Sequence, residues 1–429
     1  MIVDALAGLW REEGATPLGV DALLRSAAAG AAGLAPEAVP GAEPYRVPAG
    51  RPGDYATALA QRLARRAGGD PRTLAAGIAA EARRRPDVLD ARVEGNGFVN
   101  LTVTGTARAR SVRAAVRGLP YLRGPATLRT AAPAPPAAGA AAADDGIALS
   151  DLSAAADLPA ARRLARDDAR RRIALALTGH PGVGLDAAAV WPVRAHLDPG
   201  TGDVTWRDPP PDTAAAVGGD AASAAEPARL LAVIGEATAR IAFCRSAAER
   251  PRAGELTGPG LPALPTPEHP GAWARQTDAN PAFGIRYAHA HAVRSREWIA
   301  DAARAAGAEP PPGAPFAAFD APAAVAVLTA PPAAALLGAL FDGPGHLAGA
   351  GRRREPHILV RYLEGLAAAY HDWRETWGTS TGEHAGTTAH DAGRCCRDTI
   401  AARSALCAAA AAVLAAGLSL LGAAAPTRL

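Results

Sequence analysis

The segment "NPAFGIRYAHAHAVRSREW", residues 280–298, decides the architecture of the C-terminal part of this chain. Asn280 followed by Pro281 is a typical helix start, because an asparagine side chain caps free backbone amides and proline suits the first helical position. Apolar and small residues then recur at spacings of three and four, the period of an α-helix. We therefore expect a helix with an inward stripe, formed by Ile285, Ala288, Ala292, Ser295 and Ile299.

A second face of the same helix carries polar and aromatic chemistry. Tyr287, His291, Arg294 and Trp298 occupy positions i, i+4, i+7 and i+11, which lie on one continuous side. Stacking surfaces interleaved with cations are what unpaired RNA bases and their phosphates require. The alternative is that Tyr287 and Trp298 are core residues and Arg294 lies on the surface. Periodicity alone favours this alternative.

Two further helices complete an expected C-terminal bundle. One starts at Pro356 and carries a packing seam at spacings of three and four, formed by Leu359, Tyr362, Leu366, Ala369, Trp373 and Trp377. The last spans residues 398–421. Residues 405–425 are long enough to cross a membrane, but they are mostly alanine, with larger residues at helical spacing. A buried terminal helix is the better interpretation, and no membrane partner is expected.

The N-terminal part has a different pattern. Residues 53–85 predict two helices broken between Gly68 and Pro71. Alternation on both sides of Gly95 to Gly97 predicts a strand pair with Asn96 and Gly97 at the turn. Residues 1–124 are thus expected to form a small α+β domain, joined to a mainly α-helical bundle.

Stretches rich in alanine, proline and glycine separate these parts. Residues 125–146, 207–228 and 307–315 lack apolar periodicity and are interpreted as linkers or solvated insertions, and residues 378–393 as a loop between two helices. The expected divisions are an α+β domain at 1–124, a linker at 125–150, a helical connector with a disordered insertion at 151–272, and a helical domain at 273–429.

The composition excludes several kinds of chemistry. The net charge is +3, and all 45 basic residues are arginine, because the chain contains no lysine. A phosphate loop ending in Gly-Lys and a lysine nucleophile are therefore impossible. The chain has no GxGxxG turn, no nucleophile elbow and no CxxC pair, and its histidines lack metal-ligand spacing on a helix. We expect no catalytic residue, no metal and no cofactor. The N-terminal residues lack a basic, signal-like start, which favours the cytoplasm.

Three stretches, taken in order, resemble the DALR-type anticodon-binding domain of arginyl-tRNA synthetases. They are "NPAFGIRYAHAHA" at 280–292, "EPHILVRYLEGLAAAYHDW" at 355–373 and "RSALCAAAAAVLAAGLSLLGAAAPTRL" at 403–429. The family resemblance implies a nucleic-acid-binding role for Asn280, Phe283 and Tyr287. This chain departs from the family at Gly284, Arg286 and His291, where tyrosine, glutamine and arginine are usual.

The N-terminal part is similar to the amino-terminal domain of the same synthetases. "GDYATALAQRLARRAGGDPRTLA" at 53–75 and "VEGNGFVNL" at 93–101 carry this resemblance. That domain contacts the tRNA elbow, which implies contact roles for the matching positions, Tyr55, Asn96, Phe98 and Asn100. Residues 163–186 resemble the segment that joins the synthetase catalytic domain to its bundle.

The catalytic domain of a class I synthetase has no counterpart in this sequence. Neither a HIGH-type histidine pair nor a KMSKS loop is present, and residues 122–162 are too few for a nucleotide-binding sheet. The pattern is similar to the arginyl-tRNA-synthetase-related anticodon-binding proteins of the NrtL type. It implies a non-catalytic, cytoplasmic protein that binds tRNA, of the arginine type.

Particular side chains follow from this hypothesis. Tyr287 and Trp298 would stack on bases, and His291 lies on the same face, while Arg286, Arg294 and Arg361 would meet phosphates or base edges. Two alternatives remain. One is an arginine-tRNA ligase, and the other is a regulatory or assembly protein that binds a synthetase or another protein through its helical bundle.

Overall fold

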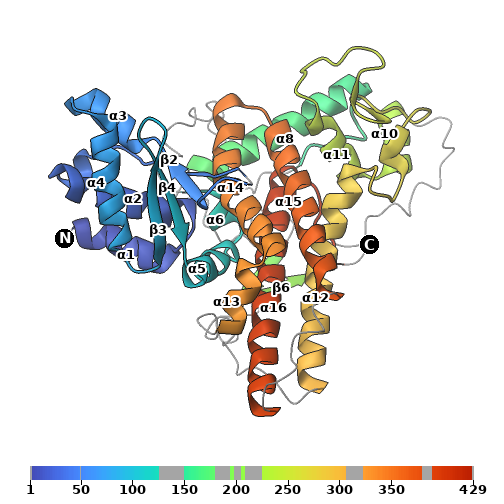
Figure 1. Cartoon of the computed structure of the whole chain (residues 1–429). Helices are drawn as coiled ribbons and strands as arrows, with labels where there is room; N and C mark the ends of the chain where they lie inside the picture. The colour runs from blue at the N-terminus through green and yellow to red at the C-terminus, as the bar shows by residue number, and fades with distance from the viewer. Residues whose placement is uncertain are drawn as a thin grey trace.

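The structure is a computed structural model that describes residues 2–48, 50–124, 149–178, 194–197, 204–207, 225–305, 322–378 and 389–427. Figure 1 shows an N-terminal α+β domain, in blue, beside a group of long helices from the C-terminal part. This arrangement confirms the expected fold class, an α+β domain joined to a mainly α-helical bundle. The expected linkers at 125–146 and 307–315 lie outside the described residues.

The N-terminal domain packs helices against a small antiparallel sheet. The sheet contains β1 (Tyr45–Arg46), β2 (Tyr55–Thr57), β3 (Val88–Glu94) and β4 (Phe98–Val103), in the order β1-β2-β4-β3. The remaining elements are α1 (Ile2–Glu13), α2 (Pro17–Ala32), the short 3₁₀ helix η1 (Pro36–Ala38), α3 (Leu59–Ala67) and α4 (Pro71–Arg83). A core of side chains from these helices and the sheet holds the domain together.

The predicted hairpin and helix break are both confirmed. Strands β3 and β4 pair from Glu94 and Phe98 outward, and Gly95 and Gly97, with φ of 52° and 91°, allow the tight turn. Along β4, Val99, Leu101 and Val103 are buried and the residues between them are half-exposed, as the alternation predicts. Helix α4 begins at Pro71, capped by the carboxylate of Asp70, which accepts a hydrogen bond from the Thr73 amide at 2.8 Å.

The bundle consists of long helices from the C-terminal part. They are α12 (Pro281–Ala305), α13 (Pro322–Thr329), α14 (Pro331–Arg353), α15 (His357–Glu375), the short η3 (Thr376–Gly378) and α16 (Ala389–Leu420). Asn280 caps α12 as predicted, because its Oδ1 accepts a hydrogen bond from the Ala282 amide at 3.0 Å. The inward stripe of α12 is also confirmed: Ile285, Ala288, Ala292 and Ser295 are buried, and Ile299 packs at the edge of the core.

Helix α16 is longer than the sequence indicated. It begins at Ala389, so the expected loop at 378–393 was wrong in its last residues. By length and composition, Asp398–Leu420 could span a membrane, but 72% of its most apolar window is buried inside the chain. This burial agrees with the interpretation of a terminal core helix.

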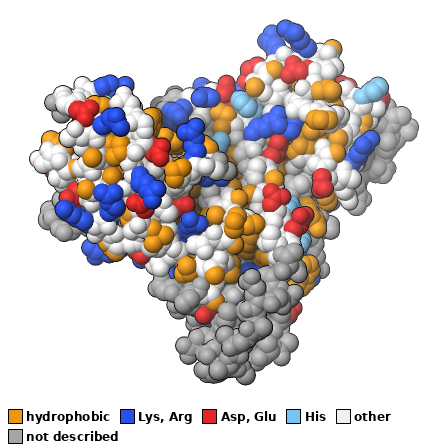
Figure 2. Space-filling view, in the orientation of Figure 1, with side chains coloured by type: hydrophobic (Ala, Val, Ile, Leu, Met, Phe, Trp, Pro, Cys, Tyr) orange, Lys and Arg blue, Asp and Glu red, His pale blue; other side chains and the backbone are white. Residues whose placement is uncertain are grey.

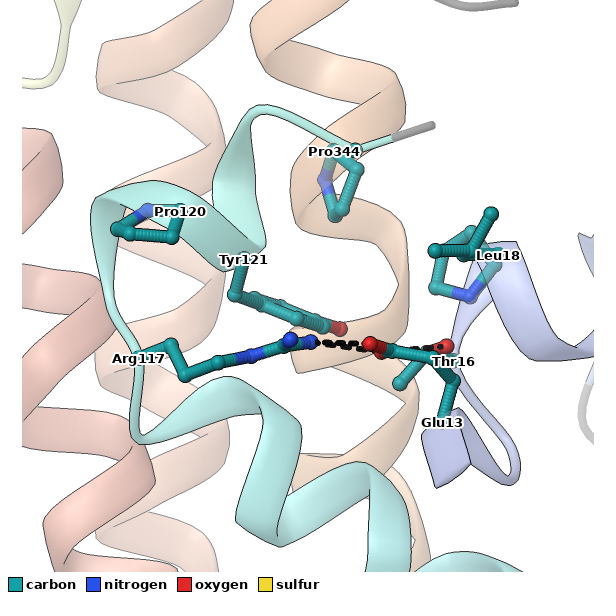
Figure 3. Close-up of a pocket in the computed structure, with 9 residues that line it drawn as sticks. Glu13, Thr16, Leu18, Arg117, Pro120, Tyr121 and Pro344 are labelled. Carbon is teal, nitrogen blue, oxygen red and sulfur yellow. Dashed lines mark hydrogen bonds and ion pairs between the residues drawn. The ribbon is translucent and has the colours of Figure 1, made fainter. Parts of the chain in front are cut away.

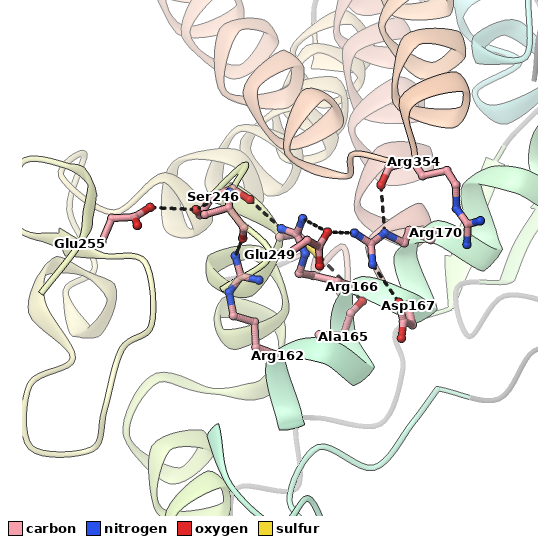
Figure 4. A network of polar contacts seen from close by, with 11 residues as sticks. Arg162, Ala165, Arg166, Asp167, Arg170, Ser246, Glu249, Glu255 and Arg354 are labelled. Carbon is pink, nitrogen blue, oxygen red and sulfur yellow. Dashed lines mark hydrogen bonds and ion pairs between the residues drawn. The ribbon is translucent and has the colours of Figure 1, made fainter. Parts of the chain in front are cut away.

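Arginines of its first helix hold the connector together. It contains α8 (Leu158–Thr178), β5 (Arg194–Leu197), β6 (Val204–Arg207), α10 (Glu226–Ile234), α11 (Glu236–Arg245), β7 (Leu256–Gly258), β8 (Leu261–Pro262) and the 3₁₀ helix η2 (Gly271–Ala274). Helix α10 includes Glu226, so the insertion expected to end at 228 ends earlier. Figure 4 shows Arg166 and Arg170 reaching from α8 toward Glu249, and Arg162 reaching toward the segment after α11.

Helices α5 (Gly105–Ala115) and α6 (Leu119–Leu122) belong to both parts of the molecule. Val112, Tyr121 and Leu122 lie in the same buried core as the long C-terminal helices. A small cavity of about 90 Å³ lies beside them, and Figure 3 shows Arg117 reaching across it to the carboxylate of Glu13. The N-terminal third therefore packs directly onto the bundle.

A proline in α14 explains one contact at this joint. Pro344 lies inside the helix and has no amide hydrogen, so the carbonyl of Leu340 loses its usual helical partner. The buried hydroxyl of Tyr121 donates a hydrogen bond to that carbonyl at 2.8 Å. One residue further, Phe341 contacts the ring of Tyr55 from β2, with ring centroids 4.4 Å apart. Arg46 and Asp342 form an ion pair of 2.8 Å between β1 and α14.

Candidate nucleic-acid interface

A row of aromatic rings crosses from α12 to α15. The rings of Phe283 and Tyr287 are stacked, with centroids 5.5 Å apart and planes 12° from parallel. Tyr287 is also stacked with His371 of α15, at 5.4 Å and 17°. His291 and Trp298 continue the row along α12, with an edge contact of 5.9 Å. We call Phe283, Tyr287, His291, Trp298 and His371 the aromatic row.

Two members of the aromatic row offer large exposed surfaces. Tyr287 is 40% exposed and Trp298 is 50% exposed, among the most exposed large apolar side chains of the described chain. The alternative that both are core residues therefore fails. A ring that is held by its neighbours and still open to solvent can accept a stacked base with little loss of side-chain entropy.

The surroundings of both histidines in the aromatic row lower their pKa and favour the neutral form. Burial lowers the pKa of His291, and the charge of Arg374 and the nearby His371 lower it further. Burial also lowers the pKa of His371, against the opposing effect of nearby acidic side chains. The Nδ1 of His291 lies 3.0 Å from the hydroxyl of Tyr370, which fixes the ring. Near neutral pH both rings are thus uncharged stacking surfaces.

The three predicted arginines differ in their contacts, and only Arg286 and Arg294 lie on the helix that carries most of the aromatic row. Arg294 pairs with Glu297 one turn along α12, in an exposed contact of the kind that contributes little to stability. Arg286 is half-buried on the same helix. Arg361 donates hydrogen bonds to the carbonyl of Thr257 at 3.0 Å and to Glu364 at 3.2 Å. Arg361 lies about 15 Å before His371 along α15, away from the row. In Figure 2, basic and acidic side chains are interspersed over the visible face.

Asn280 is a structural residue in this fold. It is 3% exposed, and its Nδ2 donates hydrogen bonds to the carbonyls of Trp273 at 2.9 Å and Arg275 at 2.8 Å. With its Oδ1 capping α12, its polar atoms are occupied within the protein. Asn280 therefore positions the aromatic row and does not itself reach the surface.

The N-terminal candidates are separated from the aromatic row, on the opposite side of Figure 1. Asn96 is exposed at the turn of the hairpin, where its carbonyl accepts a hydrogen bond from Gln61 at 2.7 Å. Phe98 and Asn100 share the half-exposed face of β4. The Nδ2 of Asn100 donates a hydrogen bond to the carbonyl of Pro52 at 3.0 Å. Tyr55 is different: it is 6% exposed and packs inside the domain joint.

Sequence reasoning missed His371 and Arg374. Both lie on α15 among the predicted seam residues, His371 between Ala369 and Trp373 and Arg374 directly after Trp373. The seam pattern shows which side of α15 is buried, but contact with α12 depends on how the two helices are aligned. Among the described residues, no group of three or more histidine, cysteine or acidic side chains could hold a metal ion.

Comparison with protein families matches both ends of the chain. Residues 314–429 match the DALR anticodon binding domain, and residues 25–103 match the arginyl tRNA synthetase N terminal domain. Both ends of this chain are similar to arginyl-tRNA synthetases. The first match includes His371 and Arg374, whereas α12 precedes it. The second match includes the whole β3–β4 hairpin.

Individual synthetases give the same result over limited segments. The arginine–tRNA ligase of Micrococcus luteus is 40% identical over 97 residues, which are 23% of this chain and 15% of the ligase. That of Anaeromyxobacter sp. is 38% identical over 155 residues, which are 36% of this chain and 22% of the ligase. The chain thus matches less than a quarter of the length of these relatives.

A solved structure aligns along nearly all of this chain. It is the arginyl-tRNA synthetase of Thermus thermophilus, aligned over 96% of this chain and 99% of that structure, with 14% identity and a TM-score of 0.44. Because this TM-score is low, the structural alignment carries no argument. The similarity to arginyl-tRNA synthetases is defined by the two sequence matches.

Proposed function

We propose that the chain is a non-catalytic tRNA-binding protein related to arginyl-tRNA synthetases. The aromatic row would bind the anticodon arm, and the outer face of the β3–β4 hairpin would bind the tRNA elbow. The observation that carries this proposal is the stack of Phe283, Tyr287 and His371, of which Tyr287 is 40% exposed, in a bundle whose C-terminal part matches an anticodon-binding domain. Unpaired anticodon bases bind proteins mainly by such stacking.

Roles of the individual residues follow from their places. Tyr287 and Trp298 would stack on bases, Phe283 and His291 would hold those rings, and Arg294 and Arg286 would meet the backbone. Asn96, Phe98 and Asn100 would contact the elbow directly, whereas Tyr55 and Asn280 would act by positioning their neighbours. The preferred RNA would be an arginine tRNA in the cytoplasm.

The binding proposal predicts a salt-dependent and selective interaction. We expect the affinity for arginine tRNA to fall as salt rises, because arginines that contact phosphates release condensed cations from the RNA. The measurement is fluorescence anisotropy of labelled tRNA over a range of potassium chloride concentrations, with a helical RNA of equal length as control. A slope near zero, or equal affinity for the control RNA, would contradict the proposal. If a partner protein, but no RNA, copurifies with the chain from cells, that result would favour the assembly alternative.

The absence of catalysis has two lines of support. Adenylate formation needs stabilisation of charge on the α-phosphate of ATP, which synthetases obtain from a histidine pair and a lysine. This chain has no lysine. In the described residues all paired strands are antiparallel, whereas a class I nucleotide site lies on a parallel sheet.

We therefore expect no arginine- and tRNA-dependent exchange of pyrophosphate into ATP. The competing function is arginine-tRNA ligation, which the names of the similar proteins favour. The measurement uses the purified chain at micromolar concentration, with an authentic arginyl-tRNA synthetase diluted to a trace level as the sensitivity control. Exchange above that trace level, dependent on both arginine and tRNA, would establish the ligase instead.

A further inference from the structure

Two arginines meet on one tryptophan at the end of α15. The guanidinium carbon of Arg374 lies 3.9 Å from the centre of the Trp377 ring. The guanidinium carbon of Arg403, from α16, lies 5.1 Å from the same ring. Trp377 itself contacts Trp373 edge to face, with centroids 5.1 Å apart, and Trp373 is buried. The indole is thus fixed by the core and carries two cations.

The guanidinium of Arg374 has no acidic partner among the described residues. Its Nε is buried and has no hydrogen-bond partner. In the described part of the chain, no carboxylate lies within ion-pair distance of its guanidinium. The acidic neighbours on α15, Asp372 and Glu375, are exposed, and their charge acts on His371. A guanidinium is planar and keeps its N–H groups in its own plane, where they can point toward an incoming acceptor.

This cationic pair lies next to the aromatic row. His371 of the aromatic row and Arg374 lie three residues apart on α15, so their side chains share one face of that helix, and the charge of Arg374 contributes to the lowered pKa of His291. The same charge, together with that of Arg403, acts on the buried thiol of Cys407 behind the pair. Arg374 therefore lies in the last turn of α15, next to His371 of the aromatic row.

We propose that Arg374 and Arg403, supported by Trp377, form a phosphate subsite that binds a backbone phosphodiester of RNA whose base stacks on the aromatic row. This inference rests on the proposed function. Among the described residues Arg374 has no carboxylate partner, and Arg403 adds a second positive charge at the same ring, so the site attracts an anionic phosphate. Arginine suits this role, because its planar donors match two oxygens of a phosphate at once.

The test compares salt dependence in matched variants. The probe is a synthetic anticodon stem-loop of arginine tRNA, and the variants are Arg374→Gln and Arg353→Gln. Arg353 is an exposed arginine just before the opposite end of α15, about 28 Å away along a helix of 19 residues. We expect Arg374→Gln to reduce the slope of log Kd against log salt by about 0.7 to 0.9, the change for one lost phosphate contact. Arg353→Gln is expected to leave the slope unchanged.

Further variants distinguish loss of the phosphate contact from loss of folding. Arg374→Lys keeps the charge and should retain most of the slope, while circular dichroism checks that each variant is folded. If Arg374→Gln unfolds the chain, Arg403→Gln replaces it with the same expected change. A wild-type slope in the folded Arg374→Gln variant overturns the subsite while leaving RNA binding intact. An absence of RNA binding by the wild type overturns the proposed function, and the subsite with it.

The source of the anion is tested separately. Inorganic phosphate is added at constant ionic strength in place of chloride, with the stem-loop as the reporter. Competition no stronger than that of chloride supports a subsite for the RNA backbone. Strong competition by inorganic phosphate, lost in Arg374→Gln, would assign the pair to a free anion and overturn the backbone assignment.

Discussion

Asp168→Ala is expected to lower the free energy of unfolding by about 3 to 5 kcal/mol, because it removes the buried partner of Arg240 and leaves only Glu236, whose side chain is 48% exposed, to pair with that cation. Asp168 and Arg240 are both 0% exposed in their side chains and lie 3.0 Å apart between α8 and α11. Asp168 also accepts hydrogen bonds from the amide and the hydroxyl of Ser150, each at 2.9 Å. Urea unfolding, monitored by circular dichroism, measures the change.

The neighbouring carboxylate provides a matched control. Asp167 is 61% exposed in its side chain and pairs with Arg170, so Asp167→Ala is expected to cost less than about 1 kcal/mol. The double variant Asp168→Leu with Arg240→Met should recover most of the lost stability, because buried ion pairs are often replaceable by apolar side chains. Equal effects of the two single alanine substitutions would contradict the buried-pair argument.

The same pair has a defined pH dependence. Burial acts to raise the pKa of Asp168, but hydrogen bonds from Ser150, Arg240 and Arg171 outweigh it, and the pKa is lowered overall. A carboxyl group whose pKa is lowered in the folded state stabilises the protein fully when the pH is above the pKa of the unfolded state, about 3.9. That contribution disappears as the pH falls through the pKa of the folded state. The stability gap between wild type and Asp168→Ala is therefore full at pH 7 and narrows below about pH 4.

Tyr287→Ala is expected to weaken binding of the anticodon stem-loop by about 1 to 3 kcal/mol, or roughly 5- to 150-fold in Kd. Tyr287 is held by Phe283 and His371, and 40% of its surface remains exposed. Tyr287→Phe keeps the ring and should retain most of the affinity. The measurement is anisotropy at fixed salt, and the salt slope should stay that of the wild type because no phosphate contact is lost.

A second exposed tyrosine tests whether position or residue type matters. Tyr45 on β1 is 44% exposed, close to the 40% of Tyr287, but it lies in the N-terminal domain away from α12. Tyr45→Ala is expected to leave stem-loop affinity within about twofold, since single surface substitutions are usually near neutral. Equal losses for the two tyrosines would mean that the aromatic row is not the binding surface.

Local patterns predicted the elements that depend on local physics. The cap at Asn280, the buried stripe of α12 and the turn at Gly95 and Gly97 all follow from neighbouring residues, and the structure has each of them. The start of α16 was misplaced because glycine and threonine residues in 378–393 indicate turns, although the helix already begins at Ala389. Long helices in packed bundles override such weak local preferences.

The candidate site could be predicted only in part, because it is built across helices. The face of α12 could be worked out from spacing, but the stacking of Tyr287 with His371 depends on how α12 and α15 are aligned. Tyr55 shows the opposite case. The family resemblance implied a contact role for Tyr55, whereas packing against Phe341 buries it at a joint between distant segments. No period within one element carries that information.

The joint at α14 has a consequence for the order in which parts of the chain fold during synthesis. Tyr121 receives its acceptor from Leu340, which lies 219 residues later, and Phe341 belongs to the core of the N-terminal domain. As the polypeptide leaves the ribosome, the N-terminal domain therefore cannot complete its packing until a segment from the last third of the chain has been synthesised. Until that segment arrives, one side of its apolar interior is open to water and to chaperones.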